Sequence, residues 1–281
     1  MREVLRRSLA LSYSALKQAK WNGEIRLNGE PVHADVRVKA GDELTVLLPE
    51  PRPAYVLRPF ELPLKIAYAD DYLLVVDKPA PLASQSSRNH PDDSLENALF
   101  AHLGCPEGFV FRPVNRLDRG TSGLMVIARD GHTQDLLQRM LHGPDFVRQY
   151  LALTEGVPEP REGVLDFPIG KAPGATVRRR VCPEGQPART RYRVLRMLDG
   201  RALVALRLET GRTHQIRVHL SYIGCPVAGD FLYGREDPER FPGRFALHSA
   251  ALRLRHPMTG EILCLASRPD FLRQLPRCPM F

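Results

Sequence analysis

The segment NRLDRGTSGLMVIAR, residues 115–129, holds the side chains with the clearest chemical potential in this chain of 281 residues. Asp118 lies between Arg116 and Arg119, shortly before an apolar stretch, Leu124–Ala128, that we expect to be a buried strand. Neighbouring cations favour the ionised form of a carboxylate. An ionised aspartate in a cleft can act as a nucleophile or as a base. The alternative is that Asp118 only closes a turn, because aspartate readily hydrogen bonds its own backbone.

A second candidate segment is GRTHQIRVHLSYIG, residues 211–224. We expect a short helix here, capped by Thr213, with Arg217 on its first turn as a fixed cation that could pair with a distant carboxylate. A surface arginine is the alternative. His214 and His219 come nearest to a pair of metal ligands, but positions five apart do not share a helix face. The chain lacks the G-x-S-x-G, P-loop, G-x-G-x-x-G and H-E-x-x-H motifs, which argues against the enzyme classes that depend on them.

Hairpins dominate the sequence around these two segments. The expected elements are a hairpin at 64–79, capped helices at 93–103 and 130–141, a strand at 146–155, and hairpins at 189–209 and 248–269. In the last hairpin Leu252 and Leu254 alternate with arginines, as in a half-buried strand. Long hairpins with few helices predict an α+β fold, a mixed but mostly antiparallel sheet with helices alongside. Residues 171–191 lack periodicity and are expected to form a basic loop that is mobile without ligand.

The first fifty residues form a distinct unit. They predict two short basic helices followed by a small sheet, with a tight turn at Asn28–Gly29. Four prolines in residues 51–63 exclude a regular helix and predict a semi-rigid linker. The expected division is therefore an accessory unit at 1–50, a linker at 51–63 and a main domain at 64–281.

The charge of the chain indicates a polyanionic partner. Forty Lys and Arg against thirty-two Asp and Glu give a net charge of +8, and such an excess attracts nucleic acid. Most of the basic residues are arginines, whose planar guanidinium groups bind phosphates through paired hydrogen bonds and stack on bases. The alternative is that the charge serves only solubility.

The cysteines and the N-terminal residues indicate a cytoplasmic protein. The five cysteines, Cys105, Cys182, Cys225, Cys264 and Cys278, form no C-x-x-C pair, so we expect free thiols in a reducing compartment and no zinc site. The first twenty residues carry too many charges for a signal peptide or a membrane span.

Residues 115–129 closely resemble the signature of the RluA family of RNA pseudouridine synthases, commonly written HRLD-x-x-TSG-L. Four further segments resemble family blocks in the family's order: VVDKPAPLASQS at 75–86, VRQYLAL at 147–153, GRTHQIRVHLSYIGCPVAGDFLYG at 211–234 and FALHSAALRLRHPMTGE at 245–261. Pro81, Arg148 and Asn115 depart from the family's usual glycine, lysine and histidine. The accessory unit separately resembles the small S-four-like RNA-binding domain that many of these synthases carry.

The resemblance implies roles for individual residues. Asp118 matches the catalytic aspartate, and Arg217 matches the arginine that pairs with it. Tyr150 matches the tyrosine that packs against the uracil and is proposed to help proton removal. Arg116 matches the arginine that helps to displace the target uridine from its stack. Further substrate-binding positions implied in the matched blocks are Asn115, Thr121, His214 and Gln215.

The function implied is isomerisation of uridine to pseudouridine in structured RNA, without cofactor or metal. Ribosomal RNA is the expected substrate because of the accessory unit, with transfer RNA as the alternative. The absence of an apolar docking stripe suggests a monomer. Two other functions fit some of the same residues: a catalytically silent RNA-binding protein of this fold, and a small-molecule hydrolase with an aspartate nucleophile. The sequence leaves open whether Asp118 attacks the anomeric carbon or removes a sugar proton.

Overall fold

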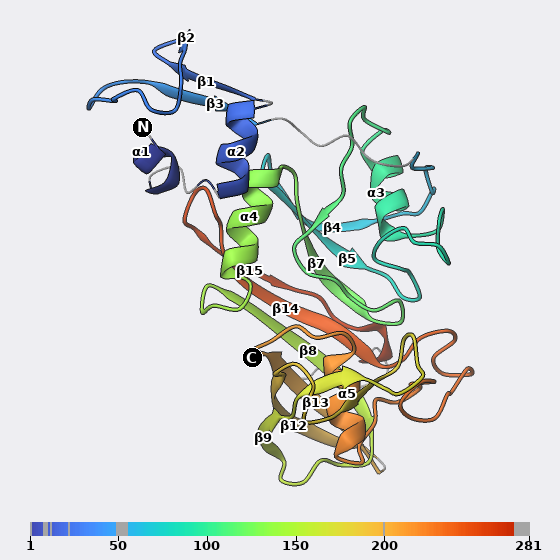
Figure 1. Cartoon of the computed structure of the whole chain (residues 1–281). Helices are drawn as coiled ribbons and strands as arrows, with labels where there is room; N and C mark the ends of the chain where they lie inside the picture. Colours follow the sequence, from blue (N-terminus) through green and yellow to red (C-terminus); the bar gives the residue numbers. More distant parts are fainter. Residues whose placement is uncertain are drawn as a thin grey trace.

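A ten-stranded sheet forms the centre of the main domain in the computed structural model, which describes residues 2–7, 11, 13–21, 23–48, 56–198 and 200–272. Its strands are β4 (Lys65–Ala69), β5 (Leu73–Lys78), β6 (Arg112–Pro113), β7 (Ser122–Ala128), β8 (Phe146–Glu155), β9 (Glu162–Asp166), β12 (Arg189–Leu198), β13 (Arg201–Leu208), β14 (Leu247–Arg255) and β15 (Ile262–Ala266). They follow the order β4-β5-β7-β14-β8-β13-β12-β9, with β15 on β14 and β6 on β7 (Figure 1). Strands β7 and β14 are parallel, and the other described pairs in this sheet are antiparallel. The expected α+β class and mixed sheet are confirmed.

Three helices pack on this sheet: α3 (Leu95–His102), α4 (Gly131–Met140) and α5 (Gln215–Tyr222). The expected caps are present on the first two. The Ser94 side chain accepts from the backbone N–H of Asn97 at the start of α3, and Asp130 caps α4 through Thr133. In the described ranges, no helix has both the length and the apolar character needed to cross a membrane.

The helices cover both faces of the sheet because its central strands are apolar on both sides. In β5, Val76 faces the core cluster that contains Leu99 of α3, whereas Val75 faces the cluster that contains Leu137 of α4. Leu220 of α5 joins the cluster of α3. Near-continuous apolar runs such as residues 73–76 and 124–128 are typical of strands buried on both faces. These two strands form a rigid base for the turn that contains Asp118.

The expected loop at 171–191 is wrong in its central part. Strands β10 (Ile169–Lys171) and β11 (Arg179–Val181) form a separate antiparallel hairpin, with Ile169 opposite Val181. Gly185 lies against the backbone of Ile169, where an added Cβ would lie 2.5 Å from the carbonyl carbon. The sequence did not predict these strands because each has only three residues and half of the six residues are charged.

The N-terminal elements form a unit with a core of its own. They are α1 (Arg2–Arg7), α2 (Tyr13–Trp21), β1 (Glu24–Leu27), β2 (Glu30–Pro31) and β3 (Leu44–Leu47). Leu5, Leu16 and Ile25 belong to one buried cluster. The turn between β1 and β2 has φ angles of 53° at Asn28 and 85° at Gly29, as an Asn-Gly hairpin turn requires, and this expectation is confirmed.

The expected linker is partly tied to the main domain. Residues 49–55 lie outside the described ranges, and residues 56–64 contain neither helix nor strand. The Arg58 carbonyl accepts from the Asn97 side chain at 2.9 Å, and the Phe60 N–H donates to the Asn97 carbonyl at 3.3 Å. These bonds fix the chain to α3 before β4 begins.

Candidate active site

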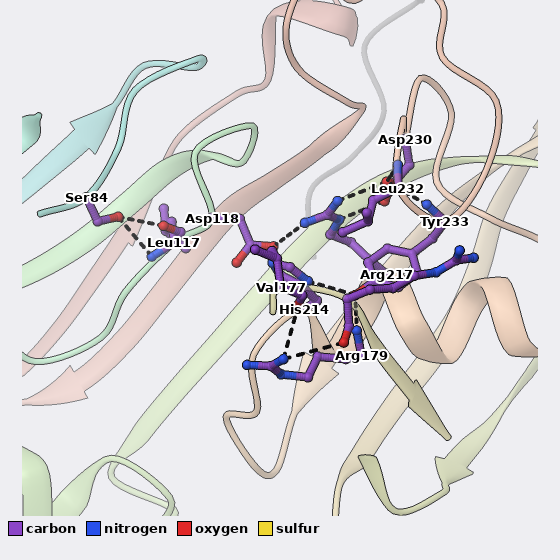
Figure 2. A network of polar contacts seen from close by, with 11 residues as sticks. Ser84, Leu117, Asp118, Val177, Arg179, His214, Arg217, Asp230, Leu232 and Tyr233 are labelled. Carbon is purple, nitrogen blue, oxygen red and sulfur yellow. Dashed lines mark hydrogen bonds and ion pairs between the residues drawn. The ribbon is translucent and has the colours of Figure 1, made fainter. Parts of the chain in front are cut away.

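Asp118 closes a turn and also presents its carboxylate to a cation. The Thr121 N–H donates to the Asp118 carbonyl at 3.0 Å, which closes the turn that leads into β7. The carboxylate points away from this bond, and its Oδ2 accepts from Nη1 of Arg217 at 3.0 Å (Figure 2). The side chain is 26% exposed. The backbone of Asp118 therefore closes the turn, while its carboxylate pairs with Arg217 instead of bonding its own backbone.

The loop that carries Asp118 is braced by the segment after β5. The Ser84 hydroxyl donates to the Leu117 carbonyl at 2.6 Å, and the Leu82 N–H donates to the Arg119 carbonyl at 2.9 Å. Lys78, fully buried, donates to the Leu82 carbonyl at 2.7 Å. Burial lowers the pKa of Lys78 to about 7. This bracing fixes the backbone on both sides of Asp118.

Arg217 lies between the carboxylates of Asp118 and Asp230 (Figure 2). These two residues are 112 positions apart in the sequence. Nε and Nη2 of Arg217 donate to the two oxygens of Asp230 at 2.7 and 2.9 Å, and its Nη1 donates to Asp118. Burial alone would lower the pKa of Arg217, but the hydrogen bonds to Asp230 and the charge of Asp118 raise it overall. Asp230 is fully buried, so it holds the guanidinium from behind and leaves one edge for Asp118.

Aromatic rings pack on the same guanidinium. Its carbon lies 4.1 Å from the ring centroid of Phe245 and 5.0 Å from that of Tyr233, within the range of cation–π attraction. The Phe245 ring also lies against Gly120, where an added Cβ would approach it to 2.6 Å. Gly120 therefore allows the ring under Arg217 to pack against the Asp118 turn.

The register of β7, β14 and β8 determines the position of Tyr150. Gly123 of β7 pairs with Ser249 of β14, and Ser249 pairs with Tyr150 of β8. A Cβ on Gly123 would lie 2.3 Å from the Ser249 carbonyl oxygen, so only glycine fits there. Burial raises the pKa of Tyr150, as does the charge of Asp118, while a hydrogen bond with the Ser249 side chain opposes the rise. The strand pairing thus places Tyr150 two strands from Gly123, which follows the Asp118 turn.

His214 also faces Asp118. Its Nε2 lies 3.9 Å from Oδ2 of the carboxylate, and its Nδ1 lies 2.8 Å from the Tyr233 hydroxyl. The expected cap of α5 at Thr213 is wrong, because the helix begins after His214, which has the left-handed φ of 59°. Arg217 lies on the first turn of this helix, as expected.

Three residues of the signature segment lie in different environments. Asn115 is buried, and its side-chain oxygen accepts from the Val126 N–H at 2.9 Å. Thr121 is also buried, beside the Asp118 turn, whereas Arg116 is exposed on the loop. Asn115 therefore fixes the loop to β7. Of these three side chains only that of Arg116 is exposed, so it alone is accessible to a large ligand.

Gln215 connects α5 to the sheet instead of facing Asp118. Its side-chain oxygen accepts from the Thr210 hydroxyl and the Arg212 N–H, and its amide donates to the Arg189 carbonyl and the Thr190 hydroxyl. All of its polar atoms are thus engaged in holding the start of the helix that presents Arg217.

Asp230 and Tyr233 are central to the site, although the sequence patterns did not single them out. Oδ1 of Asp230 also accepts from the N–H groups of Leu232 and Tyr233, which folds the chain into a turn beside α5. Both residues belong to GDFLYG, at the end of a matched block. The polar pair within that short string was the available signal.

The described residues contain no group of three or more His, Cys, Asp or Glu side chains arranged for a metal. His219 is buried, with Nδ1 at 3.0 Å from the Thr190 hydroxyl and Nε2 at 2.9 Å from the Phe167 carbonyl oxygen. Cys105, Cys182, Cys225 and Cys264 are free thiols, and Cys278 lies outside the described residues.

Comparison with known proteins identifies the family. Residues 72–222 match the family model described as RNA pseudouridylate synthase. A Bacillus subtilis protein named "Uncharacterized RNA pseudouridine synthase YjbO" is 39% identical over 255 residues, covering 90% of this chain and 89% of that protein. "Ribosomal large subunit pseudouridine synthase D" of Nitrosomonas europaea is 43% identical over 227 residues, covering 76% of this chain and 64% of that protein. The structure titled "Human RNA Pseudouridylate Synthase Domain Containing 1" has a TM-score of 0.62 and 27% identity, covering 76% of this chain and 86% of that one.

The chain belongs to the RNA pseudouridylate synthase family. This membership confirms the resemblance to the RluA family and the expected enzyme class, an isomerase that acts on RNA.

Proposed function

We propose that this enzyme converts uridine to pseudouridine in ribosomal RNA and that Asp118 is the carboxylate that reacts. The observation that carries the proposal is the arrangement of Asp118, Arg217 and Asp230. Asp230 occupies two donors of the guanidinium, so Arg217 meets Asp118 through Nη1 alone. The contacts of Asp118 with Arg217 and His214 are both made by Oδ2. Oδ1 is then the oxygen available for reaction.

The reaction needs a fixed carboxylate more than any other group. The glycosidic bond to nitrogen breaks, the uracil turns, and a bond to carbon five forms, after which the proton on carbon five leaves and the nitrogen released from the sugar takes up a proton. The atoms of the nucleotide are the same before and after, and nothing is oxidised. Asp118 attacks the anomeric carbon or removes a sugar proton in this scheme. A carboxylate already paired with Arg217 needs little rearrangement to do either.

Tyr150 and Arg116 complete the proposed site. A uridine must leave its base stack to reach Asp118, which costs a few kcal/mol that contacts with the everted base offset. The Tyr150 ring offers an aromatic face to the uracil, and its hydroxyl offers a route for the proton. Arg116, exposed beside Asp118, is suited to fill the space that the uridine vacates.

Two basic regions of the protein bind the phosphates of the RNA in this proposal. Arg178 and Arg180 are exposed at the β10–β11 hairpin, and residues 1–50 act as the S-four-like RNA-binding unit. Binding through phosphates should weaken steeply as salt is added. We expect the enzyme to act as a cytoplasmic monomer.

Ribosomal RNA is proposed because several relatives are named ribosomal large subunit pseudouridine synthase D. The test uses ribosomal RNA and transfer RNA, each labelled with tritium at carbon five of uracil and isolated from cells that lack the gene. We expect tritium release from ribosomal RNA. Release from transfer RNA alone would overturn the choice of substrate, and release from neither would overturn the activity. Sequencing the product then maps the uridine.

A further inference from the structure

His214 precedes α5 in a left-handed conformation, and its ring contacts two residues of the site. The φ angle of 59° is left-handed, and the imidazole makes no hydrogen bond that caps α5. Asparagine, aspartate and histidine adopt this conformation more often than other residues with a side chain, and glycine adopts it without steric cost. The backbone therefore accepts any of these residues, and the contacts of the ring are what distinguish histidine from them.

The Nδ1 edge of the His214 ring is fixed by Tyr233. The Arg179 N–H of β11 donates to the Tyr233 hydroxyl oxygen at 2.9 Å, and the same oxygen lies 2.8 Å from Nδ1 of His214 (Figure 2). A phenol has a single proton to donate. The Tyr233 oxygen accepts from the Arg179 N–H, so its own proton is free to be donated. Tyr233 therefore uses both its acceptor and its donor when it donates this proton to an unprotonated Nδ1 of His214. A neutral ring then carries its hydrogen on Nε2.

The Nε2 edge of the His214 ring is directed at the Asp118 carboxylate. Nε2 lies 3.9 Å from Oδ2 of Asp118. Burial lowers the pKa of His214, Arg217 and Arg179 act in the same direction, and Asp118 and Asp230 oppose them. The net direction favours the neutral imidazole, which is the state in which the Tyr233 contact sets the position of the hydrogen.

We propose that His214 is a positioning residue, held by Tyr233 as the Nε2–H tautomer, which donates to Oδ2 of Asp118 once RNA closes the site. The inference rests on the proposed role of Asp118. The present separation is longer than a hydrogen bond, and such contacts commonly shorten when substrate binds. Arg217 and His214 together then hold Oδ2, which leaves Oδ1 directed at the sugar without placing a second cation beside the carboxylate.

The tautomer can be measured without substrate. Protein labelled with ¹⁵N in its histidines gives two-bond and three-bond correlations that distinguish Nε2–H, Nδ1–H and doubly protonated rings. The His214 signal is the one that disappears in His214→Gln. We expect the Nε2–H pattern at pH 7 and its loss or mixing in Tyr233→Phe. Tyr222→Phe, on the exposed end of α5, is the matched control and should leave the pattern unchanged. An Nδ1–H or charged ring in the wild type would overturn the proposal.

Two substitutions separate positioning from a merely structural role. Asparagine suits the left-handed backbone, but its amide ends where Nδ1 of the imidazole lies. Glutamine suits the backbone less, but its amide reaches the place of Nε2 and can donate to Asp118. We therefore expect His214→Gln to retain a higher kcat than His214→Asn, with KM changed little in both. An equal or higher kcat in His214→Asn would show that the backbone conformation is what matters.

Tyr233→Phe gives a further kinetic test. We expect kcat to fall about tenfold, the effect of losing one ordinary hydrogen bond, while RNA affinity stays within about twofold of the wild type. An unchanged kcat would contradict the proposal. Failure of the proposal for His214 is distinguishable from failure of the proposed function. Tritium release by the wild type tests the function, and the NMR pattern tests the tautomer independently.

Discussion

Asp230→Asn is the substitution with the sharpest structural consequence, because it removes a charge that the fold has buried together with Arg217. Asp230 is fully buried, and the Arg217 side chain is 3% exposed. An asparagine oxygen can replace Oδ1 and still accept from Leu232 and Tyr233. The new NH₂ group would then face Nε of Arg217, which now donates to Oδ2 at 2.7 Å. Two donors would meet where an ion pair stood.

Breaking a buried ion pair by removing one partner costs roughly 3–5 kcal/mol. Arg217 keeps Asp118 as a partner, so we expect about 3 kcal/mol, the low end of that range. For a domain of this size the loss corresponds to a decrease in Tm of about 6–12 °C. We also expect kcat to fall at least about tenfold, because Arg217 is no longer held in place for Asp118.

Thermal unfolding followed by circular dichroism measures the stability, and tritium release measures kcat. Asp135→Asn is the matched control, because Asp135 forms an exposed ion pair with Arg139 one helical turn away, worth about 0.5 kcal/mol or less. If Asp230→Asn melts within the range of that control, Asp230 does not hold Arg217 and the description of the site is wrong.

Three further predictions concern neighbouring groups. Gly120→Ala should destabilise by about 1–3 kcal/mol and lower kcat, because its Cβ would displace Phe245, whereas Gly131→Ala, with 4.0 Å of clearance, should be harmless in the same unfolding and activity assays. Tyr150→Phe keeps the ring but loses the hydroxyl, so kcat for tritium release should fall about 100-fold; an equal loss of RNA affinity with kcat unchanged would contradict a role in proton transfer. Burial lowers the pKa of His248 to about 4, below the value of about 6.5 in an unfolded chain, so its contribution to stability is complete above pH 6.5 and is lost as the pH falls from 6.5 toward 4. The free energy of unfolding, measured with urea across that pH range, should show this loss. A His248→Gln variant whose free energy of unfolding depends on pH as steeply as that of the wild type would contradict the prediction.

The regular strands were predictable because their side chains alternate. Leu252 and Leu254 are buried and Arg253 and Arg255 are exposed, as the hairpin at 248–269 predicted. The β10–β11 hairpin was not predictable, because each strand has three residues and contributes a single apolar side chain, Ile169 or Val181, which is too few to form a periodic pattern. The start of α5 was misplaced by one residue, because a histidine in a left-handed conformation gives no capping signal.

The site itself depended on the family resemblance. No periodicity links Asp118 to Arg217, which are 99 positions apart. Only the pairing of β7, β14 and β8 relates Tyr150 to the strand that follows the Asp118 turn. Asp230 gave no signal of its own because a buried carboxylate is recognisable only with its partner. Asn115 and Gln215 lie in matched blocks, yet their side chains hydrogen bond neighbouring strands and loops. A motif thus indicates where function lies, while packing decides which of its residues face the substrate.

The central claim is that the Asp118 carboxylate reacts with the target nucleotide. The most direct measurement compares Asp118→Asn with Asp135→Asn in single-turnover tritium release and in RNA binding at one fixed salt concentration. Asparagine preserves the shape of the side chain and can still accept a hydrogen bond from Arg217. We predict that release falls at least about 1,000-fold in Asp118→Asn while the Kd for RNA changes by less than about threefold. Turnover by Asp118→Asn close to that of the control would contradict the claim.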